Sequence, residues 1–126
     1  MDKFLITSTS FALRAGMLEA MRFIREVGVR EIEARNLELA ALLKGSLGEV
    51  PGVKVLSPMD GGASSGLVSF TIDGVDPTAA VSQLWEKHKV VARSVAFPSC
   101  IRVSLHFFNT EEELGILVEA VRGLAR

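Results

Sequence analysis

Near the C-terminus, hydrophobic and polar residues first alternate and then recur with a helical period. The alternation predicts a strand whose two faces differ in character. Its apolar face holds Ile101, Val103 and Leu105, and its polar face holds Arg102, Ser104 and His106. Further on, Thr110 and Glu113 have the spacing of a capping box, in which both side chains bind the first free amides of a helix. We therefore predict a strand with one buried face that leads into the last helix.

The rest of the chain switches between the same two periods. Helices are predicted over residues 11–27 and 29–47, after the Asp76-Pro77 start signal, and after Thr110. Strands are predicted over residues 53–56, 66–72 and 89–93, with a loop at 94–99 before the last strand. This order indicates an α+β fold, a two-layer domain with a small, mainly antiparallel sheet and helices on one face.

Two amphipathic helices come before the sheet and predict a helical connector. We expect residues 1–48 to form an N-terminal lead and this connector, and residues 49–126 to form a small C-terminal α+β domain. At 126 residues, the two parts together make one compact domain. In a two-layer domain the second face of the sheet meets water, a ligand or another domain, and Arg102 lies on that face.

Composition excludes several classes of function. The net charge of −1 provides no electrostatic footprint for nucleic acid or for an anionic membrane. No apolar run has the length of a bilayer span, and the first residues lack the apolar core of a signal peptide. Cys100 is the only cysteine, which rules out an internal disulfide. We expect a cytoplasmic protein.

The segment from Arg102 to Glu113 carries a resemblance to a known family. Its sequence, Arg-Val-Ser-Leu-His-Phe-Phe-Asn-Thr-Glu-Glu-Glu, resembles the C-terminal signature of class V aminotransferases. These pyridoxal-phosphate enzymes include cysteine desulfurases and isopenicillin N epimerase-like proteins. Four further segments resemble the family in the same order: Phe11–Gly28, Val50–Val55, Gly66–Phe70 and Val90–Arg93. The resemblance covers essentially the whole chain.

The resemblance implies roles for individual residues. Arg102 is expected to bind the α-carboxylate of the substrate, and Arg93 to lie near the mouth of the active site. Ser8 and Thr9 lie where the family has a Gly-Thr pair whose hydroxyl reaches the cofactor phosphate of the partner subunit. For Arg102 the alternative is a surface arginine, for Arg93 it is structural charge pairing, and for Ser8 and Thr9 it is an N-cap cluster. Ser104 and His106 are expected to support the site or an interface.

Two further residues resemble reactive groups of the family. Cys100 precedes Arg102 by two residues, without the long loop that carries the cysteine nucleophile in desulfurases, so we expect a buried or edge thiol. The His88-Lys89 pair resembles the family's His-Lys dipeptide. It stands where a helix ends, so we interpret it as positive charge on the helix dipole.

The family's Schiff-base lysine belongs to a large N-terminal domain that this chain lacks. We therefore expect pyridoxal phosphate in the intact family enzyme and none bound by this chain alone, and whether the chain acts as an enzyme stays open. Expected partners are the large pyridoxal-phosphate domain or a second subunit, in a homo-oligomer that takes a small amino-acid substrate. The alternative is a stand-alone, non-catalytic α+β module for dimerisation or partner binding. The sequence does not indicate the reaction.

Overall fold

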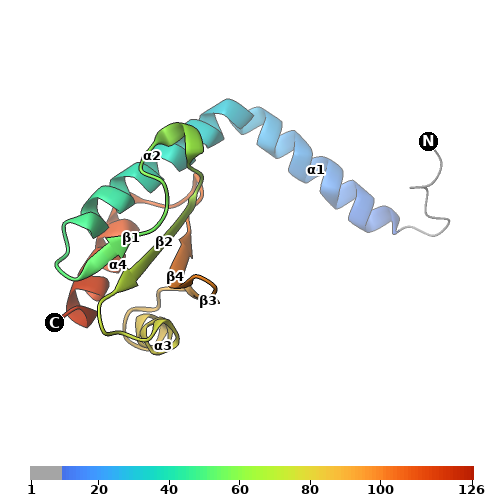
Figure 1. Ribbon diagram of the computed structural model, residues 1–126. Coiled ribbons are helices and arrows are strands. Elements are labelled where there is room, and N and C mark those ends of the chain that lie inside the picture. Colours follow the sequence, from blue (N-terminus) through green and yellow to red (C-terminus); the bar gives the residue numbers. More distant parts are fainter. Residues whose placement is uncertain (1–9) are drawn as a thin grey trace. The chain divides into compact units, whose positions relative to one another are not determined.

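The computed structural model describes residues 10–126, and the elements within them follow the predicted order (Figure 1). The α+β class is confirmed. The helices are α1 (Phe11–Val27), α2 (Val29–Gly48), α3 (Pro77–His88), α4 (Glu111–Leu124) and the short 3₁₀ helix η2 (Gly61–Ala63). The strands are β1 (Val53–Val55), β2 (Leu67–Ile72), β3 (Arg93–Ala96) and β4 (Ser99–Ser104). The chain divides into two compact units, Met1–Ile32 and Glu33–Arg126.

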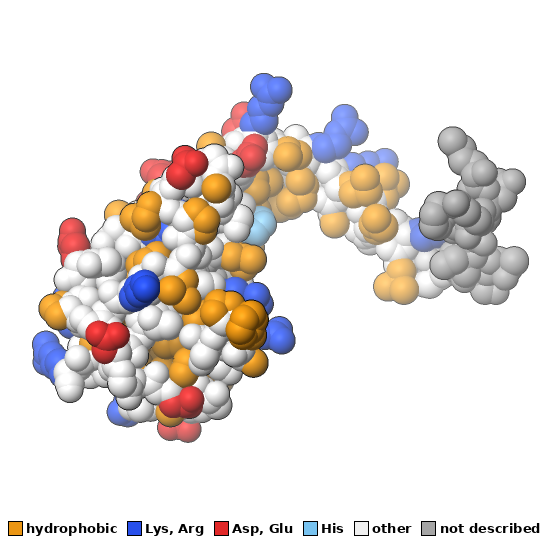
Figure 2. All heavy atoms as spheres, in the orientation of Figure 1, with side chains coloured by type: hydrophobic (Ala, Val, Ile, Leu, Met, Phe, Trp, Pro, Cys, Tyr) orange, Lys and Arg blue, Asp and Glu red, His pale blue; other side chains and the backbone are white. Residues whose placement is uncertain are grey.

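Helix α1 makes up most of the described part of the first unit. Ser10 is its N-cap, with a side chain that accepts the Leu13 N–H at 3.4 Å. Gly28 ends the helix with φ at 98°, a conformation that favours glycine, and its N–H donates to the Ile24 carbonyl at 3.0 Å. No residue of α1 is buried. Hydrophobic side chains gather along one side of this helix in Figure 2, and arginine side chains lie mainly along the other.

The second unit is built on one antiparallel sheet with strand order β1-β2-β4-β3. Val68 lies opposite Val103, and Phe70 lies opposite both Val55 and Ile101. Because side chains alternate across a strand, these apolar residues share one face. Helices α2, α3 and α4 pack on this face (Figure 1). The opposite face, which we call the open face, carries Ser69, Thr71, Arg93, Arg102 and Ser104.

The core lies between the covered face of the sheet and three helices. Phe70, at the centre of β2, is completely buried, and so are Leu39, Leu43 and Leu47 on α2. From α3 the core takes Ala80 and Leu84. From α4 it takes Leu114, Leu117, Val118, Ala120 and Val121. Burial of such side chains at about 25 cal/mol per Å² of apolar surface holds the two layers together.

The predicted strand over residues 89–93 is wrong, and so is the loop over 94–99. Lys89 takes a left-handed conformation at the end of α3, and the Val90 N–H turns back to the Leu84 carbonyl at 3.1 Å. This helix end uses the residues that the alternation had placed in a strand. The strand starts only at Arg93, and the connection from β3 to β4 shrinks to a tight turn at Phe97 and Pro98.

The predicted capping box of α4 is confirmed. The Thr110 hydroxyl accepts the Glu113 N–H at 3.3 Å, while the Glu113 carboxylate accepts the Thr110 N–H at 3.0 Å. The same carboxylate accepts the side-chain amide of Asn109 at 3.0 Å. The hydrogen bonds from Asn109 and from the Thr110 backbone lower the pKa of Glu113 below its ordinary value.

We predict that Glu113→Gln weakens the acid dependence of stability. A carboxylate with a lowered pKa stabilises the fold above the pKa of the unfolded chain, and this contribution is lost as pH falls through the folded pKa. Urea unfolding between about pH 6 and about pH 3 should show the wild type losing its advantage over the variant. Glu112→Gln is the matched control, because it removes a charge from the same helical turn without these hydrogen bonds. A constant difference between Glu113→Gln and wild type across this range would contradict the prediction.

Candidate functional site

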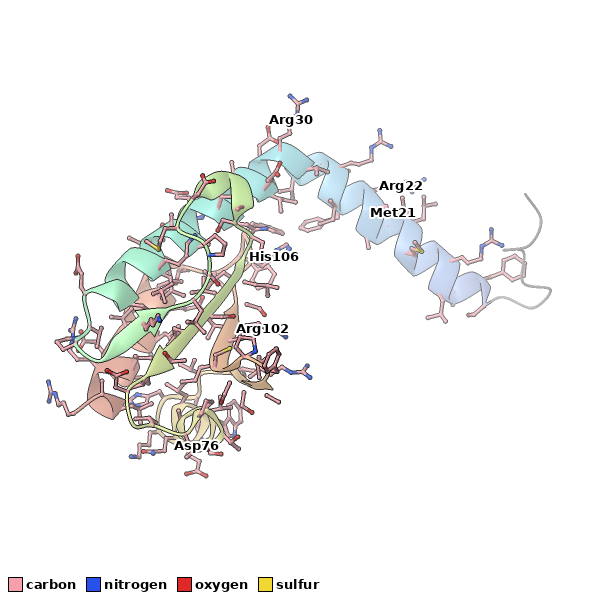
Figure 3. All side chains as sticks on the ribbon, viewed as in Figure 1. Met21, Arg22, Arg30, Asp76, Arg102 and His106 are labelled. Atoms are coloured by element: carbon pink, nitrogen blue, oxygen red, sulfur yellow. The ribbon has the colours of Figure 1, made fainter. Side chains whose placement is uncertain are left out.

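Two arginines lie side by side on the open face. In the β3–β4 pair Arg93 lies opposite Arg102, and in the β2–β4 pair Ser69 lies opposite Arg102. Residues directly opposite each other in an antiparallel pair project to the same side. The register therefore places Ser69, Arg102 and Arg93 in one row across three strands. Figure 3 shows Arg102 on β4 and His106 just beyond the end of this strand.

The row carries two positive charges with no negative partner in the described chain. Within residues 10–126, neither Arg93 nor Arg102 forms an ion pair, and the buried Nε of Arg102 makes no hydrogen bond. Other arginines do find carboxylates: Arg22 pairs with Glu19, Arg35 with Glu38 and Glu111, and Arg122 with Glu119. Like charges directly opposite each other destabilise a sheet. An anion between the two guanidinium groups would relieve this repulsion.

A carboxylate is the anion that best fits such a row. A guanidinium group is planar, and two parallel N–H groups match the two oxygens of a carboxylate. Arg102 is half-buried and Arg93 is exposed, so a bound carboxylate would be only partly shielded from water. Partial burial strengthens a charged hydrogen bond relative to one on an exposed surface.

The segment after β4 is organised by Asn109, which the sequence analysis did not single out. Its Oδ1 accepts the His106 N–H at 2.9 Å, and its own N–H donates to the His106 carbonyl at 2.9 Å. The strand predicted to continue to His106 ends at Ser104, and beyond it His106 stacks on Phe108, with ring centroids 5.0 Å apart. An asparagine directly before a threonine cap was the available signal for this turn.

The structure describes Cys100 but not Ser8 and Thr9, the other residues considered from the sequence. Cys100 is free and buried, as predicted for a thiol outside a reactive loop. The alternation along β4 nevertheless places it on the open face, two residues before Arg102. Ser8 and Thr9 lie outside the described residues, so their proposed contact with a cofactor phosphate stays a prediction.

The lysines within residues 10–126 do not fit a pyridoxal-phosphate site by themselves. Lys44 is buried, and its amino group donates to the Pro58 carbonyl at 2.6 Å and to the Ser64 hydroxyl at 2.7 Å. Lys89 ends α3, where its Nζ donates to the Glu86 carbonyl, and Lys54 lies on the edge strand β1, two strands away from Arg102. Lys87 lies on α3, where its Nζ donates to the side-chain oxygen of Gln83 at 2.8 Å.

Two other kinds of site are absent from the described residues. Over residues 10–126, no three His, Cys, Asp or Glu side chains come together as a group that could hold a metal ion. Among the helices of the same range, none is both long enough and apolar enough to cross a membrane.

Comparison with known proteins identifies the family. The sequence matches the family described as aminotransferase class-V over residues 7–117, and the chain belongs to this family. Isopenicillin N epimerase from Streptomyces clavuligerus is 31% identical over 109 residues, which are 84% of this chain and 27% of the epimerase. Probable cysteine desulfurase 1 from Mycobacterium leprae is 27% identical over 98% of this chain and 22% of its own length.

Solved structures support the same family. The cystine C–S lyase C-DES, in complex with its reaction product cysteine persulfide, superposes with a TM-score of 0.82 and is 27% identical. The match covers 95% of this chain and 31% of that chain. Another structure of C-DES holds glycine covalently linked to its pyridoxal-phosphate cofactor. The cofactor predicted for the family is therefore confirmed.

The matched region is part of a longer polypeptide in these relatives. The chain spans 27% of the epimerase, 22% of the desulfurase and 31% of the C-DES chain. These lengths agree with the prediction that the family enzyme has a further, larger domain beyond the matched region.

Proposed function

We propose that this chain supplies the C-terminal small domain and helical connector of a class V pyridoxal-phosphate enzyme, in which Arg102 binds the substrate α-carboxylate. The observation that carries this proposal is the row of Arg93 and Arg102, two opposed guanidinium groups without a carboxylate partner among residues 10–126. An amino-acid substrate would supply the missing anion. The domain is not catalytically complete by itself.

Each residue of the row has its own part in this proposal. Arg102 takes the carboxylate in two parallel hydrogen bonds, which fixes the orientation of the amino acid as well as its position. Arg93 adds positive charge from the neighbouring strand and is exposed to solvent, so it steers the anion rather than holding it. Pyridoxal phosphate, held by the rest of the enzyme, supplies the electron sink for reactions at the amino-acid carbon.

Helix α1 supports the idea of a larger body. Its apolar side chains include Leu13, Met17, Met21 and Phe23, all exposed. Arg22 lies on the opposite side of the helical wheel from Met17, while Arg14 and Arg25 lie at the edge of the apolar side, next to Met21. A helix that leaves its apolar side uncovered is normally an interface. We assign this side to the large cofactor domain of the enzyme, and the contact of Ser8 and Thr9 with the cofactor phosphate of the partner subunit stays a prediction.

The test joins this chain to the part of Streptomyces clavuligerus isopenicillin N epimerase that it does not span. We expect this hybrid to bind pyridoxal phosphate, seen by absorbance. Arg102→Gln should then raise KM about 10-fold to 100-fold with cofactor binding unchanged, because one charged bidentate contact is lost. Arg93→Gln should raise KM less.

Arg122→Gln is the control for charge, since Arg122 pairs with Glu119 on α4 and lies outside the row. It should leave KM unchanged. An Arg102→Gln hybrid with wild-type KM would contradict the role of this arginine. A hybrid that never binds cofactor, together with an isolated chain that self-associates, would instead support the non-catalytic dimerisation module.

A further inference from the structure

A pocket of about 670 Å³ lies in the second unit, and neither Arg93 nor Arg102 lines it. It opens between the end of α3, the end of β4 and the first turns of α4. Val103, Leu114 and Leu117 form its floor, and these three side chains belong to the hydrophobic core. The pocket is therefore a gap in the core layer, and its volume is in the range of ligand-sized cavities.

Exposed apolar side chains surround the mouth of this pocket. Val91 is 79% exposed, Phe108 is 70% exposed and Ile116 is 46% exposed. An apolar rim above an apolar floor is costly in water, since each buried methylene group is worth about 0.8 kcal/mol. The combination is typical of a surface that another polypeptide covers.

The backbone hydrogen bonding of β4 beside the pocket also ends early. Pairing between β3 and β4 stops at Arg93 and Arg102, because residues 89–92 turn away to close the end of α3. The Leu105 N–H donates to the Gly66 carbonyl on the β2 side at 2.7 Å, so alternation directs the N–H and C=O of Ser104 to the other side. Within residues 10–126, no hydrogen bond joins Ser104 to residues 89–92.

We propose that a strand from the remainder of the class V polypeptide pairs with Ser104 and inserts apolar side chains into this pocket. An unpaired strand end offers backbone hydrogen bonds, and the pocket beside it takes alternate side chains of an added strand. The occupant is assigned to the same enzyme because the matched relatives contain far more polypeptide than this chain, which spans 27% of the epimerase and 31% of C-DES. The inference rests on the proposed function as a domain of a longer enzyme.

The probe is a set of synthetic peptides of roughly 12 residues, long enough for one strand, that tile the part of the Streptomyces clavuligerus epimerase outside the match. We expect one contiguous group of peptides to bind the 126-residue chain. Bound peptide should slow amide exchange at Ser104 and leave exchange at the α1 amides unchanged.

Ile116→Asp should weaken this binding about tenfold or more, because it places a charge at the apolar rim. Leu42→Asp is the matched control, since Leu42 is 47% exposed and Ile116 is 46% exposed, and Leu42 lies outside the pocket. Absence of any binding peptide, protection elsewhere than at Ser104, or equal losses in both variants would overturn the inference.

The two proposals fail separately. Peptide binding without any effect of Arg102→Gln in the hybrid would remove the arginine role and keep the docked strand. A normal response to Arg102→Gln without a binding peptide would remove the strand and keep the substrate site.

Discussion

Replacing Phe70 by alanine should lower the free energy of unfolding by about 3–5 kcal/mol, the range found for buried aromatic side chains. Phe70 has no exposed surface and lies at the centre of the sheet, between Val55 on β1 and Ile101 on β4. Its ring belongs to the same buried cluster as the apolar side chains of α2, α3 and α4. Truncation would open a cavity between the two layers, which the strands cannot close without moving β4.

Urea unfolding followed by far-UV circular dichroism measures this loss. Phe108→Ala is the control, because this ring is mostly exposed, and it should cost less than about 1 kcal/mol. Because β4 carries Arg102, the Phe70 variant should also bind substrate more weakly in the hybrid enzyme. A loss below about 1 kcal/mol for Phe70→Ala would contradict the assignment of this residue to the centre of the core.

Replacing Lys44 by alanine should cost about 2–4 kcal/mol, the second largest effect that we expect. This lysine is 1% exposed, and its ammonium group joins α2 to the loop between β1 and β2 through the Pro58 carbonyl and the Ser64 hydroxyl. The alanine variant removes both hydrogen bonds and leaves the volume of the side chain empty.

Lys44→Met separates the two contributions. Methionine keeps most of the apolar stem and removes the cost of a buried ammonium group, so it should destabilise less than alanine. Both variants should expose the loop around η2 to faster proteolysis, because its anchor is gone. Lys54→Ala, at an exposed position on β1, should change stability by less than about 0.5 kcal/mol. Equal losses in the alanine and methionine variants would show that the ammonium contacts, rather than the stem, carry the effect.

The periodic parts of the fold could be predicted from the sequence. The strands around Val68 and Val103 show the predicted alternation, and α2 and α4 show the predicted helical period. Both patterns depend only on residues close in sequence, so they can be recognised without the structure. The start of β3 could not be predicted, because it depends on a left-handed Lys89 and on a hydrogen bond from Val90 back to α3. Residues 90–92 are all apolar, and this pattern is compatible both with a strand and with a segment that packs against the end of a helix.

The candidate site was predictable only in part. The family signature indicated Arg102 and Arg93 separately, whereas their opposition depends on strand register, which a tight turn sets and no local pattern reveals. Lys44 escaped notice because a lysine on an amphipathic helix is normally solvated. The partners that bury it, Pro58 and Ser64, come from a loop without any periodic signal.

The short connection between β3 and β4 also limits how this region of the family can change in length. Successive residues of a strand point to opposite faces, so inserting one residue that shifts the pairing would turn Arg93 toward the core and bring Ser94 out in its place. Longer connections are compatible with substrate binding only if the added residues bulge outward and leave the pairing untouched. A longer loop at this hairpin, including one with a reactive side chain, must therefore leave the strand register unchanged. Otherwise Arg93 would no longer lie on the open face.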